Sequence, residues 1–224
     1  NGVLEASNCY VYLTNSDLRA AVKVWRDSAF SVTGGRFANA VLVQDSSVSI
    51  GEATFTGSSS YLLRIDRPTT EAPAIVACTF VGGSTPATVA LAVTSVIAQE
   101  LILTSNVFTD FAATSDEGLL RVDSQTGQLE VKMRANLFLR VCSARIRRCA
   151  QIVAKSITML ACHFNRAGPL LLDVSVAQLT DCSFHHYVAQ HSNDPILKIQ
   201  RTRQPATTPT DLSVTLVSCS IRFA

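Results

Sequence analysis

The stretch Leu101-Ile-Leu-Thr-Ser-Asn-Val-Phe108 decides the fold, because closely similar stretches follow it along the chain. It returns as Val131-Lys-Met-Arg-Ala-Asn-Leu-Phe138 and again as Ile157-Thr-Met-Leu-Ala-Cys-His-Phe164. Each copy begins with two apolar residues that are separated by one other residue, and each ends on Asn or Cys, any residue and then Phe. Self-similarity of this kind is the sequence signature of a repeat architecture.

The final triplet of these stretches occurs throughout the chain, with a small residue, Asn or Cys in its first position. Seven copies end at Phe30, Phe55, Phe80, Phe108, Phe138, Phe164 and Phe184, and a degenerate eighth copy ends at Ile221. Successive copies are 25, 25, 28, 30, 26, 20 and 37 residues apart. Seven of the ten Phe residues occupy this one position, so the triplet marks a structural repeat.

Two segments of each repeat alternate apolar and polar residues, which is the period of a β-strand with one buried face. One segment precedes the triplet, as in Leu101 and Leu103. For the other segment we expect the inward pairs Val41/Val43, Leu63/Ile65, Leu91/Val93, Leu120/Val122, Ile152/Ala154, Leu172/Val174 and Leu197/Ile199. Repeats with two strands and no helix predict an all-β, parallel solenoid of about eight coils, with residues 1–224 in one domain.

The triplet that follows a strand, in coils of variable length, resembles the right-handed parallel β-helix repeats of the pectin-lyase-like superfamily. The resemblance runs from about residue 18 to residue 224. It implies the fold and says little about activity, because that superfamily includes polysaccharide lyases and hydrolases, phage tailspikes, adhesins and β-helices without any chemistry.

The alternative fold is a leucine-rich-repeat solenoid, whose Leu-x-Leu-x-x-Asn core matches Leu101 to Asn106. That repeat continues into a helix or 3₁₀ segment, whereas residues 118–123 and 195–200 alternate like strands. Intervals of 30 and 37 residues also exceed its usual length. The sequence therefore favours the β-helix.

Composition narrows the functional classes. Hydrophobic residues make up 47% of the chain, charged residues 16%, and the formal net charge is +2. This balance excludes a disordered chain and argues against a nucleic-acid binder, which carries a larger basic excess. The most apolar stretch, residues 87–108, is interrupted by polar residues and predicts no membrane span. No signal peptide is visible at the N-terminus.

Equivalent positions of successive coils lie above one another, so the first triplet position forms a row. The row reads Ser28, Ala53, Cys78, Asn106, Asn136, Cys162, Cys182 and Cys219. We expect Asn106 and Asn136 to form an amide ladder and the cysteines of the row to be reduced and structural. For Cys142 and Cys149, which lie off the row, the sequence permits a disulfide-closed basic loop or two ordinary cysteines and favours the latter.

Two outward rows contain the candidate catalytic residues. One row reads Gln44, Asp66, Thr94, Asp123, Lys155, Ser175 and Gln200, and the other reads Leu42, Arg64, Ala92, Arg121, Val153, Asp173 and Lys198. Asp66 and Asp123 are expected two coils apart, roughly 9.6 Å, near the upper limit for the carboxylates of an inverting glycosidase. Arg64 and Arg121 would then assist an acidic sugar. Against this hypothesis, alternating charges on an exposed ladder are usually a solvated face, and the hydrolase signatures of the superfamily are missing.

His186 and His191 are the candidate metal ligands, but they are five residues apart and no third ligand has a metal-binding spacing. We therefore expect no metal and no other cofactor. Loop arginines that could contact an acidic protein partner are Arg145, Arg147, Arg148, Arg201 and Arg203.

The expected function is a non-enzymatic β-helical scaffold or binding segment of a larger assembly, extracellular or at a cell surface. The alternative is a carbohydrate-active enzyme, a polysaccharide lyase or glycoside hydrolase that uses the Asp66/Asp123 face. Neither end of the chain has the polar cap that solenoids carry. This predicts a segment of a longer polypeptide, or protein partners stacked on both ends, with a polysaccharide as a further partner.

Overall fold

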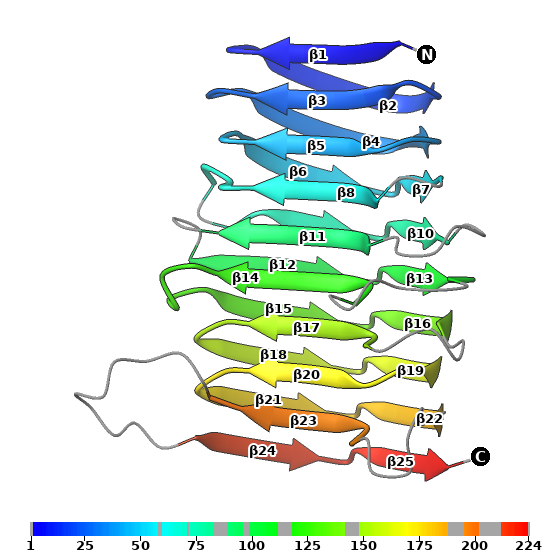
Figure 1. The fold of residues 1–224 in the computed structure, drawn as a ribbon, viewed down its shortest axis with the longest axis vertical. Helices are drawn as coiled ribbons and strands as arrows, with labels where there is room; N and C mark the ends of the chain where they lie inside the picture. The colour runs from blue at the N-terminus through cyan, green and yellow to red at the C-terminus, as the bar shows by residue number, and fades with distance from the viewer. Residues whose placement is uncertain are drawn as a thin grey trace.

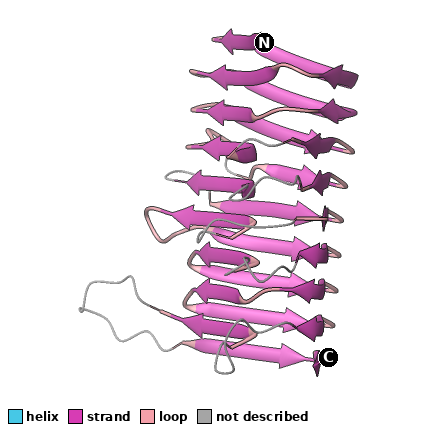
Figure 2. Cartoon of the chain, turned by 45° about the vertical axis from the view of Figure 1, so that its right-hand side comes forward, coloured by secondary structure: helices cyan, strands magenta, loops and turns pink. Residues whose placement is uncertain are grey.

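The computed structural model describes residues 2–57, 60–70, 72–82, 89–95, 99–111, 118–141, 148–187, 195–201 and 212–223. These residues form 25 β-strands, and no helix occurs among them (Figures 1 and 2). The strands belong to two long parallel sheets. The described part of the chain is therefore all-β, as the alternating segments predict.

The first sheet has nine strands, and each strand pairs in parallel with the strand from the preceding pass of the chain. In spatial order they are β1 (Val3–Ser7), β3 (Ala21–Trp25), β5 (Val41–Gln44), β8 (Tyr61–Asp66), β11 (Val89–Ser95), β14 (Leu120–Ser124), β17 (Ala150–Val153), β20 (Leu170–Asp173) and β23 (Leu197–Gln200).

The second sheet has sixteen strands and consists of two runs that share a long strand, β4 (Ala29–Phe37). The first half of β4 pairs with one run and its second half with the other, while β2 (Tyr10–Leu18) pairs along its length. One run contains β6 (Ser47–Gly51), β9 (Ala74–Val76), β12 (Glu100–Thr104), β15 (Glu130–Arg134), β18 (Ser156–Leu160), β21 (Val176–Thr180) and β24 (Ser213–Val217). The other contains β7 (Thr54–Thr56), β10 (Thr79–Val81), β13 (Val107–Thr109), β16 (Leu137–Val141), β19 (His163–Ala167), β22 (Ser183–Tyr187) and β25 (Ser220–Phe223).

Repeating parallel strands of this kind are compatible with a β-helix-like solenoid (Figure 1). The repeat has one strand more than the sequence predicts, because each Phe of the triplets from Phe55 onward lies on a short strand of its own. A leucine-rich repeat requires a helical return segment, and the described residues contain none.

Phenylalanine rings run through the core in one stack. Successive ring centroids lie 4.6–5.1 Å apart and the rings are nearly parallel, from Phe37 through Phe55, Phe80, Phe108, Phe138 and Phe164 to Phe184. The triplet pattern assigned Phe30 to the same position as the other Phe residues, and this prediction was wrong. Phe30 pairs with Val48 in the other run of the sheet. Phe37 takes its place beside Phe55, because β4 passes the corner as one continuous strand.

Two further expectations are corrected by the register. Ser28 does not share the row of Ala53 and Cys78: its Oγ accepts a 3.3 Å hydrogen bond from the backbone N of Cys9, at the corner between β3 and β4. In β17 and β20 the register aligns Ala150/Ile152 and Leu170/Leu172 with the inward pair Leu120/Val122, so the outward rows continue through Val153 and Asp173, and through Gln151 and Leu171. Ala154 and Val174, predicted as inward residues, are buried but lie past the ends of these strands. Lys155 and Ser175, predicted in the first row, lie beyond the strand ends.

Candidate functional site

The predicted Asp and Arg residues lie near one another on the outer face of the nine-stranded sheet. Arg64 and Asp66 project from β8, and Arg121 and Asp123 project from β14. Between them lies β11, on which Ala92 is the register partner of both arginines and Thr94 that of both aspartates. The sequence therefore placed these residues correctly, with Asp66 and Asp123 two strands apart.

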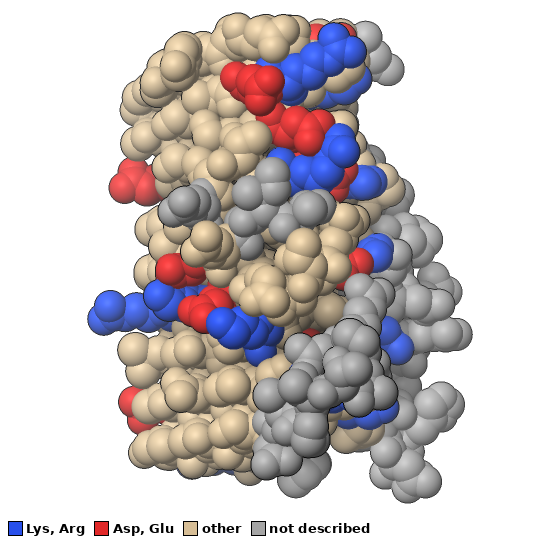
Figure 3. Space-filling model, turned by 90° about the vertical axis from the view of Figure 1, so that its left-hand side faces the viewer, with Lys and Arg blue, Asp and Glu red and all other residues tan. Residues whose placement is uncertain are grey.

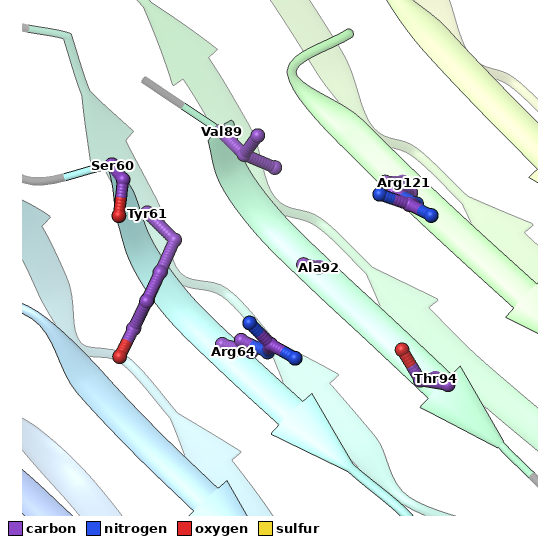
Figure 4. Close-up of a pocket in the computed structure, with 7 residues that line it drawn as sticks. All are labelled: Ser60, Tyr61, Arg64, Val89, Ala92, Thr94 and Arg121. Atoms are coloured by element: carbon purple, nitrogen blue, oxygen red, sulfur yellow. The ribbon is translucent and has the colours of Figure 1, made fainter. Parts of the chain in front are cut away.

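Because Ala92 is small, the surface between the two arginines is hollow. The hollow, here called the Arg64–Arg121 groove, has a volume of about 220 Å³ and is also lined by Ser60, Tyr61 and Thr94. Figure 4 shows the two guanidinium groups on either side of the strand that carries Ala92. Among the described residues, the lining contains two cationic side chains and no carboxylate.

Each aspartate forms an ion pair with the arginine of its own strand. Arg64 Nε lies 2.8 Å from Asp66 Oδ2, and Arg121 Nη2 lies 3.9 Å from Asp123 Oδ2. The arginine side chains are 48% and 37% exposed, the aspartates only 18% and 20%. Asp66 Oδ1 is buried and has no hydrogen-bond partner. Each arginine side chain is thus more exposed than the aspartate with which it pairs.

Opposite charges also alternate elsewhere on the surface. Lys132 Nζ lies 2.8 Å from Glu100 Oε1, and Arg67 Nη2 lies 2.6 Å from Asp45 Oδ2. The hydrogen bond that Lys132 donates to Glu100 raises the pKa of Lys132. On the face of Figure 3, acidic and basic atoms lie beside one another. Exposed pairs of this kind contribute little to stability and do not by themselves mark a site.

The first positions of the triplets form a row at the corner before the short strands. The middle of this row is polar, and Cys residues lie on either side of the polar positions. Asn106 Nδ2 donates to Asn136 Oδ1 at 3.0 Å, which confirms the predicted amide ladder. Cys78, Cys162, Cys182 and Cys219 are free thiols. Burial raises the pKa of Cys78 to about 11, and a hydrogen bond to Cys162 together with burial raises that of Cys182. The hydrogen bond with Cys182 lowers the pKa of Cys162, which is fully buried. Cys78 and Cys182 are therefore packing groups and not activated nucleophiles.

The remaining candidates are only partly within the described residues. His191, Cys142, Arg145, Arg147 and Arg203 lie outside them, as does the side chain of His186. Arg148 donates from Nη1 to Gln151 Oε1 at 2.8 Å, and Arg201 follows β23. Cys149 is buried. Among the described residues, no group of three or more His, Cys, Asp or Glu side chains is arranged to hold a metal ion.

Sequence reasoning missed two groups of residues on the nine-stranded sheet. The Tyr61 ring lies beside Arg64, with 5.9 Å between its centroid and Arg64 Cζ. Trp25 is flanked by Lys23 Nζ at 4.0 Å and Arg26 Cζ at 4.7 Å. The available signal for the first was an aromatic residue three positions before an arginine at the start of a strand, which is too common to be specific.

No protein-family model, no curated protein and no solved structure significantly matches this chain. The described residues include no helix with the length and hydropathy needed to cross a membrane. Function is therefore inferred from the geometry of the sheets and of the Arg64–Arg121 groove.

Proposed function

We propose that this chain is a right-handed parallel β-helix of about eight coils, as in the pectin-lyase-like superfamily, and that it is a non-enzymatic scaffold or binding segment of a larger assembly. In Figure 1 the strands of the nine-stranded sheet point left at the front, those behind point right, and the chain descends. This sense supports a right-handed path, which parallel crossovers almost always take.

The observation that carries the scaffold function is the unbroken ring stack from Phe37 to Phe184. Its ring spacing, 4.6–5.1 Å, equals about one strand spacing. From Phe37 to Phe184, each pass of the chain therefore packs against the next through a ring in its core. Close-packed interiors deform little and transmit strain. A rod of this kind presents side chains at fixed intervals, which is what a scaffold requires.

Partner binding at the ends of the rod is supported by exposed apolar residues in inward positions. Leu216 on β24 is 54% exposed, and Ile221, the register partner of Phe184, is 51% exposed. At the other end Leu4 on β1, the register partner of the buried Val22, is 40% exposed. Solenoids cover such surfaces with a further layer. We propose that flanking polypeptide or protein partners supply it, and that the assembly is extracellular or at a cell surface.

Light scattering tests the role of the ends on residues 1–224 expressed alone. Open ends predict end-to-end oligomers or aggregation, and the double variant Leu216→Glu with Ile221→Glu should reduce the mass toward that of one chain. A monomeric wild-type chain with a cooperative melt would contradict covered ends. Labelling of intact cells with a membrane-impermeant reagent tests the location of the parent protein.

The alternative function, a carbohydrate-active enzyme, is favoured by one observation: the Arg64–Arg121 groove lies next to Asp66 and Asp123. Against it, Oδ2 of each aspartate is engaged by the arginine of its own strand. The test is the release of reducing sugar or unsaturated product from a panel of acidic and neutral polysaccharides. We expect none. Activity that is lost in Asp66→Asn or Asp123→Asn, but kept in the surface variant Asp17→Asn, would overturn the scaffold proposal.

A further inference from the structure

The sheets end in edge strands at the two ends of the stack, which lie at the top and the bottom of Figure 1. Among the described strands, β1 pairs only with β3 and β2 only with β4 at the first end. At the second end β23, β24 and β25 pair only with β20, β21 and β22. An edge strand exposes a row of backbone N–H and C=O groups, which is a template for pairing with another chain.

The two ends have the same register. In the nine-stranded sheet, successive register partners lead from Leu4 on β1 to Leu197 on β23. In the other sheet they lead from Tyr12 on β2 to Thr215 on β24. The strands at the first end could therefore follow those at the second end as one further pass.

The corner of the second sheet also matches between the two ends. Asn15 lies three residues after Tyr12, and Ser218 lies three residues after Thr215. Both residues are left-handed, with φ of 46° and 52°. The backbones of the two ends therefore turn at the same position and in the same sense, as parallel pairing around the corner requires.

The inward positions of both ends are aliphatic. At the first end they are Leu4, Ala6, Val11, Leu13 and Leu18, and at the second end, in the same order, Leu197, Ile199, Val214, Leu216 and Ile221. Leu4 is 40% exposed and Val214 is 42% exposed. Stacking of one end on the other would cover these side chains with apolar partners, and burial of apolar surface drives association.

The edge strands of the two ends carry opposite charges. β1 and β2 contain Glu5 and Asp17 and no basic residue, whereas β23, β24 and β25 contain Lys198 and Arg222 and no acidic residue. All four residues are exposed. Glu5 follows Leu4 and Lys198 follows Leu197, so a continued register would place Glu5 of one copy beside Lys198 of another. Opposite cross-strand charges attract, while two like ends would bring like charges together.

We propose that a second copy of this chain stacks head to tail on the first, with β1 and β2 of one copy added in register to β23, β24 and β25 of the other. The inference rests on the proposed function as a segment of a larger assembly and names the partner at its ends. Contact between two different ends along one axis does not close, so its repetition builds a fibre. Nine strands at about 4.8 Å give an axial repeat of about 43 Å per copy.

An exchange of charge between the ends tests this geometry on residues 1–224. Glu5→Lys leaves a chain that is basic at both of these positions, and Lys198→Glu leaves one that is acidic at both. At low ionic strength each variant alone should associate about three- to tenfold more weakly than the wild type, because like charges meet. An equimolar mixture of the two variants should recover the association, because alternating copies pair opposite charges. Light scattering over a concentration series measures it, and added salt should reduce the differences.

The matched controls are Glu52→Lys and Arg134→Glu, which make the same changes of charge at exposed positions in inner passes. Alone or mixed, they should associate like the wild type. Melting curves check that each variant is folded. The double variant Glu5→Lys with Lys198→Glu should associate like the wild type, so it decides where one single variant is unstable. Electron microscopy of the wild type should show fibres with the axial repeat of about 43 Å.

Three results would overturn the proposal: a wild-type chain that stays monomeric, association that stops at dimers, or association that is equal in the wild type, both charge variants and their mixture. Association that requires Leu216 and Ile221 but ignores the charge exchange would mean that the ends are covered in another way. In that case only this inference fails and the scaffold proposal stands. Turnover of a saccharide, in contrast, would refute the scaffold and leave the head-to-tail stacking intact.

Discussion

Asn106 Nδ2 donates a 3.0 Å hydrogen bond to Oδ1 of Asn136, thirty residues away in the sequence and one pass away in space. The same oxygen accepts the backbone N–H of Asn106 at 3.0 Å, and Asn136 Nδ2 donates to the carbonyl of Leu103 at 2.7 Å. Both side chains are fully buried. The two amides therefore satisfy backbone groups that the chain exposes where it turns from one strand to the next.

Asn136→Ala should lower the free energy of unfolding by at least about 3 kcal/mol. The change removes three hydrogen bonds of the Asn136 side chain: those from the backbone N–H and from the side-chain amide of Asn106, and the one to the Leu103 carbonyl. A buried unsatisfied group costs about 1–3 kcal/mol. Urea denaturation measures the loss. Asn165→Ala, at an exposed position on β19, is the control and should stay within about 0.5 kcal/mol of the wild type. Equal effects at both positions would contradict the ladder.

The ring stack makes a second prediction. The centroids of Phe108 and Phe138 lie 4.6 Å apart at an interplanar angle of 3°, and both rings are buried. Phe108→Ala or Phe138→Ala should each cost about 3–5 kcal/mol, because a large core side chain is lost and a cavity remains. Tyr10→Ala, which removes a ring that is 77% exposed, should cost less than about 0.5 kcal/mol. Near-neutral Phe variants in the same denaturation assay would refute the stack.

The sequence predicted the ladder and most of the stack because one short corner recurs without change. Between the strand that ends at Thr104 and the strand that begins at Val107 there are only two residues, and the same count separates Arg134 from Leu137. A fixed corner length keeps the register constant, so equal positions in the sequence become neighbours in space. The row of Asn106 and Asn136 could therefore be found from spacing alone.

The errors occur where that corner signal is missing or ambiguous. β4 continues around the corner through Gly34 and Gly35, both with positive φ. Gly35-Arg36-Phe37 also has a small residue two positions before Phe, so the sequence offers two candidates, and the register places Phe37, not Phe30, beside Phe55. In β17, Ile152 and Val153 are both buried although they face opposite sides, so either alternation of the strand looks apolar. The row predicted from the sequence already places Ala92 between Arg64 and Arg121, as the register confirms. The hollow itself escaped prediction, because its volume depends on how the surrounding side chains pack.

A third prediction concerns the backbone at these corners. The residue before each position of the Asn and Cys row is left-handed without being Gly, as in Ala135 and Ala161 with φ of 51° each. A left-handed residue with a Cβ costs roughly 1–2 kcal/mol, so Ala135→Gly should raise the free energy of unfolding by about 0.5–1 kcal/mol.

The control for the glycine variant is Ala29→Gly in β4, where the backbone is extended. Glycine in a strand loses more conformational entropy and should lower stability by about 0.5–1 kcal/mol. Chemical denaturation of both variants gives the two signs. Destabilisation of the same size at Ala135 and Ala29 would show that the corner does not require a left-handed residue.

The last prediction is a loss of stability at alkaline pH through Cys78. Burial raises the pKa of this thiol from 9.0 to about 11. Below pH 9 the thiol is protonated in both states and its contribution is fully present. Between pH 9 and about 11 the unfolded chain releases the proton while the folded chain keeps it, so stability falls with rising pH. The rise of the Cys78 pKa from 9.0 to about 11 corresponds to about 3 kcal/mol of stability.

Cys78→Ala is the matched variant, because Ala53 occupies the preceding position of the row. Denaturation curves from pH 7 to 11 should show a constant difference between wild type and variant below pH 9, and a steeper decline of the wild type above it. Parallel curves over the whole range would mean that the thiol is not shielded from water in the core.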